Sequence, residues 1–185
     1  MYKKTLTPFN YDRIMTDQIK KHVIAILVDN EFGALARIVE LFSARGYNIE
    51  SLNVAPTSLD KKLSRITITT YGTTKTVDLI CKLLKRIVPV HTAAELTREH
   101  GYIERELALV QIIADEQKRE EALKLIDKYR THIVEIAGDS MVFEVIGTTE
   151  TIDELLVQLP NFGLASVSRT GIAAGFKGEK KLANV

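Results

Sequence analysis

The chain has 185 residues, of which 45% are hydrophobic and 26% charged, with 25 basic and 24 acidic side chains. This length accommodates one domain or two small ones, and the hydrophobic share excludes a disordered chain. The net charge of +1 gives no reason to expect a nucleic acid or an acidic membrane surface as partner. A single cysteine, Cys81, excludes an intramolecular disulfide, and no segment approaches the roughly 18 apolar residues of a membrane helix. We therefore expect a soluble, cytoplasmic protein.

Both ends of the chain are predicted to be tails. Residues 1–21 mix charges, Pro8 and isolated aromatic side chains without periodicity, and they lack the apolar run of a signal peptide. Met15 is an alternative start of the protein. Residues 176–185 contain three lysines, a composition that favours a solvated polar end over a binding patch.

From His22 on, the hydrophobic pattern predicts strands and helices in turn. The run HVIAILVDN is apolar and rich in β-branched residues, which predicts a strand. In the next segment, FGALARIVELFSARG, the residues at i, i+3, i+4 and i+7 line one helical face: Leu35, Ile38, Val39 and Phe42. Asn30 lies in the expected N-cap region of this helix, and Gly46 marks its end. A strand, a second strand, a helix and a short strand follow at 47–57, 63–72, 76–88 and 90–96.

The same order of elements then repeats. Its members are a strand at 104–115, a helix at 120–130, a hairpin at 132–138 and 140–148, a helix at 151–159 and a strand at 164–175. Thr151 and Glu154 have the spacing of a capping box, although a helix start one or two residues earlier fits as well. The chain therefore reads as two copies of one unit.

A strand–helix–strand–strand–helix–strand unit is typical of the ferredoxin-like fold, a four-stranded antiparallel sheet with two helices on one face. The sequence thus predicts an α+β protein with two tandem ferredoxin-like βαββαβ units, at 22–97 and 103–175. Each helix offers one apolar stripe, so the other face of each sheet must meet water, another domain or another subunit. Units of this size have small cores, which favours pairing of units or chains.

The residue types that commonly catalyse reactions or bind metals form no recognisable site. The histidines occur singly, without metal-ligand spacing, and are expected at the surface or at element ends: His22, His91, His100 and His132. Cys81 lies in an apolar helix, which favours a buried, unreactive thiol. Glu104 and Glu106 share one face of a strand, where a surface salt-bridge cluster is favoured over an acid–base pair. We expect no catalytic residue, no metal site and no cofactor in this chain.

The segment Asp29–Leu35, between the first strand and the first helix, is a candidate binding loop. A helix N-terminus presents unpaired N–H groups and a partial positive charge, which suits a carboxylate or a phosphate. Gly33 has no Cβ and lets a ligand approach the backbone, and Asn30 can both donate and accept. Asn48 stands at the start of the following strand. Taken alone, the Asp29–Leu35 loop and Asn48 are each better explained by ordinary turn chemistry than by a binding role.

Together these segments resemble the regulatory (small) subunit of acetolactate synthase, also called acetohydroxyacid synthase. The family pattern N-x-x-G-x-L-x-R, followed by G-(Y/F)-N-I-x-S-L-x-V, matches DNEFGALARIVELFSARGYNIESLNVAPT, and LSRITI, IERELALVQI and SRTG are similar to the family as well. The resemblance covers about residues 22–175. The positions that match the pattern are Asn30, Gly33, Leu35, Arg37, Gly46, Tyr47, Asn48, Ile49, Ser51, Leu52 and Val54.

The resemblance implies a regulatory function without catalysis. The first unit would be an ACT domain, a small-molecule sensor that pairs with a second copy in a homodimer. The chain would bind the catalytic large subunit, which uses thiamine diphosphate, Mg²⁺ and FAD. It would raise the activity of that subunit and make it sensitive to feedback inhibition by branched-chain amino acids, above all valine, in the biosynthesis of valine, leucine and isoleucine.

The resemblance also implies an effector site. The residues expected to contact the effector are Asn30, Gly33, Ala34, Leu35, Asn48 and Ile49. Main-chain N–H groups at the helix start would hold the carboxylate, and the two asparagines would hold the ammonium, Asn48 coming from the neighbouring chain. The two apolar side chains would form the wall for the branched side chain. Ala36 and Ala55 match positions at which the family readily loses feedback sensitivity, although many relatives carry serine at the first of these.

The alternative function is a free-standing ACT-domain sensor that regulates transcription or another enzyme. Such a protein would need a helix-turn-helix or a partner domain, and the sequence contains neither. RNA binding on an exposed sheet face would need aromatic residues on the central strands and a basic surface, which HVIAILV and SRITITT do not provide. A small hydrolase on the same fold would need the catalytic groups that are missing above.

Overall fold

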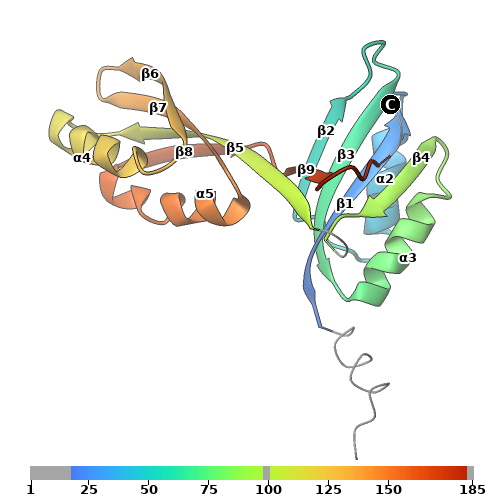
Figure 1. Ribbon diagram of the computed structural model, residues 1–185. Coiled ribbons are helices and arrows are strands. Elements are labelled where there is room, and N and C mark those ends of the chain that lie inside the picture. Colours follow the sequence, from blue (N-terminus) through green and yellow to red (C-terminus); the bar gives the residue numbers. More distant parts are fainter. Residues whose placement is uncertain (1–17, 98–100, 183–185) are drawn as a thin grey trace, which may run out of the picture. The chain divides into compact units, whose positions relative to one another are not determined.

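The computed structural model describes residues 18–97 and 101–182 (Figure 1). The chain divides into two compact units. The first takes the residues up to Ile103 together with those from Ala174 on, and the second takes Glu104–Ala173. Each unit is described by itself below.

The first unit has the element order expected of a ferredoxin-like fold. Its elements are β1 (Lys20–Asp29), α2 (Ala34–Ser43), β2 (Ser51–Pro56), β3 (Leu63–Gly72), α3 (Thr74–Leu84) and β4 (Val90–Glu95). The strands form an antiparallel sheet in the order β2-β3-β1-β4, so β2 and β4 are its edges. Both helices cover the same face of this sheet (Figure 1).

The main core of this unit lies between the sheet and the two helices. Alternate residues of β1, such as Ile24 and Ile26, are fully buried there against Ile38 and Phe42 of α2. The expected apolar stripe of α2 is only partly buried, because Leu35 and Val39 remain more than one third exposed. The buried face of α2 is instead completed by Ala34, so the helix is rotated relative to the stripe predicted from sequence.

The opposite face of the first sheet carries a second apolar cluster. Val23 and Ala25 of β1 are fully buried there, with Phe176 and Leu182 packed against them. Residues 174–182 therefore belong to the first unit, whereas a polar tail was expected from residue 176. The physical reason is that β1 is apolar at successive positions, so both of its faces need cover.

The second unit repeats the topology. Its elements are β5 (Tyr102–Ile113), α4 (Glu116–Ile126), β6 (Thr131–Ala137), β7 (Ser140–Gly147), α5 (Thr149–Leu156), the short 3₁₀ helix η1 (Leu159–Phe162) and β8 (Leu164–Arg169). The sheet order is β6-β7-β5-β8. The predicted α+β architecture of two tandem ferredoxin-like units is thus confirmed.

The last predicted strand, 164–175, is divided in the structure. β8 ends at Arg169, and a separate strand β9 (Ala173–Phe176) pairs with β5. Gly171 between them has a φ of 74°, a left-handed conformation that interrupts an extended strand. No helix within 18–97 and 101–182 is long and apolar enough to cross a lipid bilayer.

Candidate functional site

The N-terminus of α2 differs from the other α-helix starts in the described ranges. Its N-cap is Gly33, which supplies no side-chain hydrogen bond. In contrast, α3, α4 and α5 begin with Thr73, Asp115 and Thr148, each of which accepts a hydrogen bond from a first-turn N–H. Helix geometry leaves the first N–H groups without intrahelical acceptors. The first turn of α2 therefore keeps its donor capacity for a partner from outside the helix.

Gly33 lies exposed at the start of α2. Its φ is 81°, and a Cβ built at this position would meet no heavy atom within 4 Å. The glycine is required by the left-handed backbone and not by crowding from the protein. A ligand can therefore reach the main chain at this point without displacing a side chain.

The main-chain donors at the start of α2 are not all equivalent. Ala34 is only 5% exposed, and its N–H donates to the carbonyl of Glu31 at 3.3 Å. Leu35 and Ala36 are exposed and follow in the first turn. Of the N–H groups expected to hold a carboxylate, that of Ala34 is thus already used within the loop, whereas Leu35 lies on the exposed side of the first turn.

Asn30 is not the N-cap of α2 but a link between loops. Its side-chain amide donates to the carbonyl of Lys61 at 2.9 Å, and its backbone N–H donates to the carbonyl of Lys62 at 2.7 Å. The side-chain oxygen is the part of Asn30 that could accept a bond from an ammonium group.

Asn48 and Ile49 lie at the other end of the same sheet. The carbonyl of Asn48 accepts a hydrogen bond from the hydroxyl of Thr70 at 2.6 Å, whereas Asn30 bonds to Lys62. Lys62 directly precedes β3, and Thr70 lies within it eight residues later, or about 26 Å at 3.3 Å per residue. A single copy of the chain therefore cannot bring Asn30 and Asn48 to one small ligand.

Exposed apolar side chains gather on α2 and on the edge strand β2. Leu35 and Val39 of α2 and Val54 of β2 remain 37%, 36% and 42% exposed. Ala36 and Ala55, on the same two elements, are exposed as well. Ile49 packs against the core of the first unit and is only partly exposed.

The acidic residues of β5 are buried, which corrects the expectation of a surface cluster. Glu106 is 5% exposed and accepts two hydrogen bonds from Arg169, at 2.8 and 2.7 Å. The same guanidinium donates to Asp153 at 2.6 Å. The hydrogen bonds that Arg169 donates to Glu106, and next the one it donates to Asp153, raise the pKa of Arg169. This network joins β5, β8 and α5 and is structural.

The histidines were expected at the surface or at element ends, and His22, the third residue of β1, lies near such an end but is buried. His22 is fully buried, and its Nδ1 lies 2.9 Å from Glu95 of β4. His91 lies on the surface with its Nε2 2.6 Å from Asp29, and His100 falls outside the described residues. Within the described ranges, no three His, Cys, Asp or Glu side chains are grouped so as to hold a metal ion.

Known proteins similar to this chain agree on one family. The profile of the family described as "Small subunit of acetolactate synthase" matches residues 105–175, and that of "AHAS small subunit-like ACT domain" matches residues 24–92. The probable acetolactate synthase small subunit of Archaeoglobus fulgidus is 38% identical over 161 residues, which cover 87% of this chain and 99% of the relative. The isozyme 3 small subunit of Salmonella typhimurium is 37% identical, covering 86% and 98%.

A solved structure supports the same assignment at the level of the whole fold. The acetolactate synthase small subunit of Thermotoga maritima superposes with a TM-score of 0.79 at 28% identity. The match covers 87% of this chain and 99% of that structure. The sequence relatives, the two family profiles and the fold agree, and the chain belongs to the acetolactate synthase small subunit family.

Proposed function

We propose that this protein is the regulatory subunit of acetolactate synthase. In this role it binds and activates the catalytic large subunit and makes it sensitive to feedback inhibition by branched-chain amino acids, with valine as the main effector. It performs no reaction of its own; thiamine diphosphate, Mg²⁺ and FAD belong to the large subunit. The observation that carries the proposal is the uncapped N-terminus of α2 beside the left-handed Gly33.

The chemistry of this helix start fits a zwitterionic amino acid. The effector carboxylate would lie on the N–H groups of the first turn, where the helix dipole favours negative charge. The side-chain oxygen of Asn30 would accept a bond from the ammonium group, because its amide already donates to Lys61. The exposed part of Leu35 would contact the aliphatic side chain.

A homodimer through the first unit would complete this site. β2 is an edge strand of six residues, about 20 Å long. If two copies of β2 pair antiparallel about a two-fold axis, the start of one lies near the end of the other. Asn48 and Ile49 of the second copy then approach the sheet end that carries Asn30 and Gly33. The exposed apolar side chains of α2 and β2 would be covered at the same time.

Feedback follows if the effector binds one arrangement of the dimer better than another. A ligand shifts an equilibrium only by its differential affinity for the two states. An amino acid held between two protomers contacts both, so its affinity depends on how they are placed. The arrangement that binds valine well would then be the one in which the large subunit is less active.

Reconstitution with the purified large subunit tests this function. We expect the chain to raise acetolactate formation from pyruvate, and valine to lower it in a saturable manner. Leucine and isoleucine should act more weakly by modest factors, since one methylene is worth only about 1–3 kcal/mol in an apolar pocket. No activation of the large subunit would refute the regulatory assignment, and activation without any amino-acid response would refute the effector site.

A further inference from the structure

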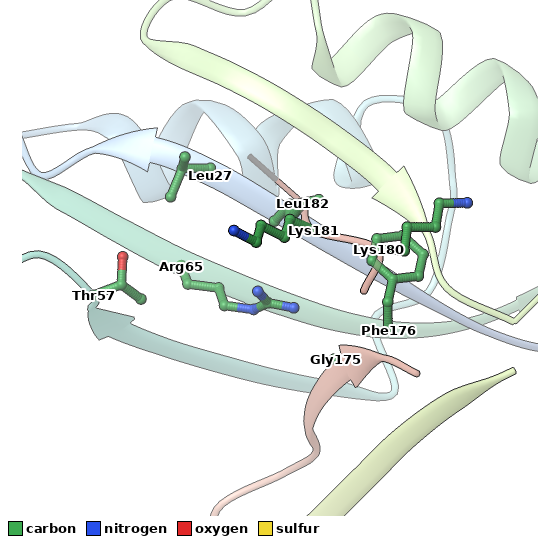
Figure 2. Close-up of a pocket in the computed structure, with 8 residues that line it drawn as sticks. All are labelled: Leu27, Thr57, Arg65, Gly175, Phe176, Lys180, Lys181 and Leu182. Atoms are coloured by element: carbon green, nitrogen blue, oxygen red, sulfur yellow. The ribbon is translucent and has the colours of Figure 1, made fainter. Parts of the chain in front are cut away.

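A cavity lies on the face of the first sheet that is turned away from α2 and α3. Its volume is about 330 Å³, and all of its lining residues belong to the first unit. Leu27 and Arg65 are cross-strand neighbours on β1 and β3 and alternate with residues that face the helices. Phe176 and Leu182, from the C-terminal segment 174–182, form the opposite wall (Figure 2).

The cavity is cationic although the chain as a whole is nearly neutral. Among the described residues, its lining includes Arg65, Lys180 and Lys181 and no acidic side chain. The ammonium group of Lys180 lies over the ring of Phe176, 4.7 Å from its centroid. In Figure 2 the Lys181 side chain extends from the C-terminal segment toward Leu27 and Arg65. Arg65 and Lys181 thus bring two positive charges to one cavity of about 330 Å³, in contrast with the balanced composition of the chain.

The charged guanidinium group of Arg65 is partly buried. Its Nη2 donates to the main-chain carbonyl of Ala174. A carbonyl oxygen has no net charge, so this bond orients the guanidinium without neutralising it. Burial lowers the pKa of Arg65, because desolvation penalises the charged form. An oxyanion in the cavity would offset that cost and use the remaining guanidinium donors.

We propose that this cavity is a second ligand site, which binds a small organic anion through a carboxylate or phosphate group. Arg65 offers planar paired donors, Lys181 adds a second positive charge, and Thr57 adds a hydroxyl to the lining. Leu27, Phe176 and Leu182 contact the short apolar body of the ligand. In this proposal Lys181 binds the ligand, whereas the sequence favoured a solvated end for the terminal lysines.

The site goes beyond the effector function proposed above. The α2 N-terminus recognises an anion through main-chain N–H groups, whereas this cavity uses side-chain cations on the opposite face of the sheet. Its ligand would touch β3 and the C-terminal segment together. Because a ligand stabilises the state to which it binds, occupancy should hold residues 174–182 more firmly against the sheet.

An NMR titration of the full-length chain tests the proposal. The probes are inorganic phosphate and 3-methylbutanoate, a carboxylate without an ammonium group, at constant ionic strength. We expect saturable shifts of the backbone amides of Thr57, Gly175 and Phe176 with at least one probe. A response to phosphate alone assigns a phosphorylated ligand, and a response to the carboxylate alone assigns an organic acid.

Two variants and a matched control connect the response to the cavity. Arg65→Gln and Lys181→Gln should each weaken binding at least about five-fold, since each removes one of the cations that face the anion. Lys181 is exposed, so its variant should fold normally even if Arg65→Gln loosens the segment. Arg86→Gln, an exposed charge just after α3, should leave the affinity unchanged. Unsaturable shifts with both probes, or full binding by both cavity variants, would overturn the proposal.

Discussion

Gly33 is the residue on which the proposed effector site depends. It combines a left-handed backbone with an open approach, since no heavy atom lies within 4 Å of the place that a Cβ would occupy. A side chain added there would therefore project into space that a ligand needs, without disturbing the core. Aspartate and asparagine at this position differ in charge but hardly in size, so a comparison of these two variants isolates the effect of charge on binding.

Gly33→Asp should weaken amino-acid binding more than Gly33→Asn does. Both residues tolerate a left-handed φ better than other side chains do, but only aspartate places a negative charge near the effector carboxylate. At a separation of about 4 Å that repulsion costs about 1–4 kcal/mol, or roughly five- to several-hundred-fold in affinity. Calorimetric titration with valine measures both variants. Equal affinities for Asp and Asn would contradict a carboxylate subsite at this helix start.

The ion pair between Glu106 and Arg169 should be a strong determinant of the stability of the second unit. Arg169→Met would leave a 5% exposed carboxylate without its bidentate partner. We expect a loss of about 2–3 kcal/mol in the free energy of unfolding, below the range for fully buried pairs because Arg169 is 31% exposed. Urea denaturation followed by circular dichroism measures this loss.

The double variant Glu106→Gln, Arg169→Met is the control for this ion pair. Removal of both charges should restore much of the lost stability. If the single and double variants are equally unstable, the effect arises from packing and not from the stranded carboxylate.

At the scale of single elements, the helix caps explain why α2 is available for a ligand while its counterparts are not. The side chain of Asp115 accepts a hydrogen bond from the N–H of Lys118 at 2.9 Å and closes the start of α4. Asp115→Ala should therefore lower the free energy of unfolding by about 1 kcal/mol, and Asp115→Asn should retain most of it. Urea titrations of the two variants decide this; equal stability would show that the cap contributes nothing.

The edge strand β2 is the element that the proposed dimer requires. Val54→Lys places a charge on an edge residue that is 42% exposed in the isolated chain, and burial of an unpaired charge at an interface is unfavourable. We expect this variant to shift sedimentation equilibrium toward monomer. Leu79→Lys on α3 is the matched control, since Leu79 is 44% exposed on a different element. A dimer that tolerates Val54→Lys as well as Leu79→Lys would place the interface elsewhere.

Most strands and helices could be predicted from the sequence, because the spacing of apolar residues is a local pattern. Strand β3 and helices α2 and α3 follow from apolar spacing, since one buried face repeats every two or every 3.6 residues. Helix α4, expected at 120–130, begins earlier, at Glu116, because its first turn is polar and carries no apolar signal. The N-cap of α2 was not predictable in this way. Asn30 has a side chain that commonly caps helices, but it donates a hydrogen bond to the carbonyl of Lys61, 31 residues away in the sequence. The N-cap position is occupied by Gly33 instead. The rotation of α2 that exposes Leu35 and Val39 depends on tertiary packing too.

The site was predictable only in part, for the same reason. The loop around Gly33 carries a sequence pattern, and the resemblance to a family singled it out. The wide separation of Asn30 and Asn48 follows from the register of β3 with its neighbours, which no local pattern encodes. The role of segment 174–182 was also hidden, because its polar composition conceals Phe176 and Leu182, which find their partners on β1.

At the scale of the whole molecule, the central claim is that one effector site needs two copies of the chain. About 26 Å of sheet separates Asn30 and Asn48 within a protomer, so a second protomer must supply the second asparagine. In a two-fold dimer, each of two sites then combines Gly33 of one copy with Asn48 of the other.

Complementation between two inactive variants measures this claim directly. Gly33→Asp and Asn48→Ala homodimers should each bind no valine with wild-type affinity. After the two chains are unfolded and refolded together in equal amounts, each mixed dimer should contain one intact site, which restores roughly a quarter of the wild-type binding capacity. Recovery of that fraction in calorimetry at wild-type affinity is the predicted result. If the mixture binds no more valine than the separate variants do, the site lies within one chain, and an effector site shared between two protomers is contradicted.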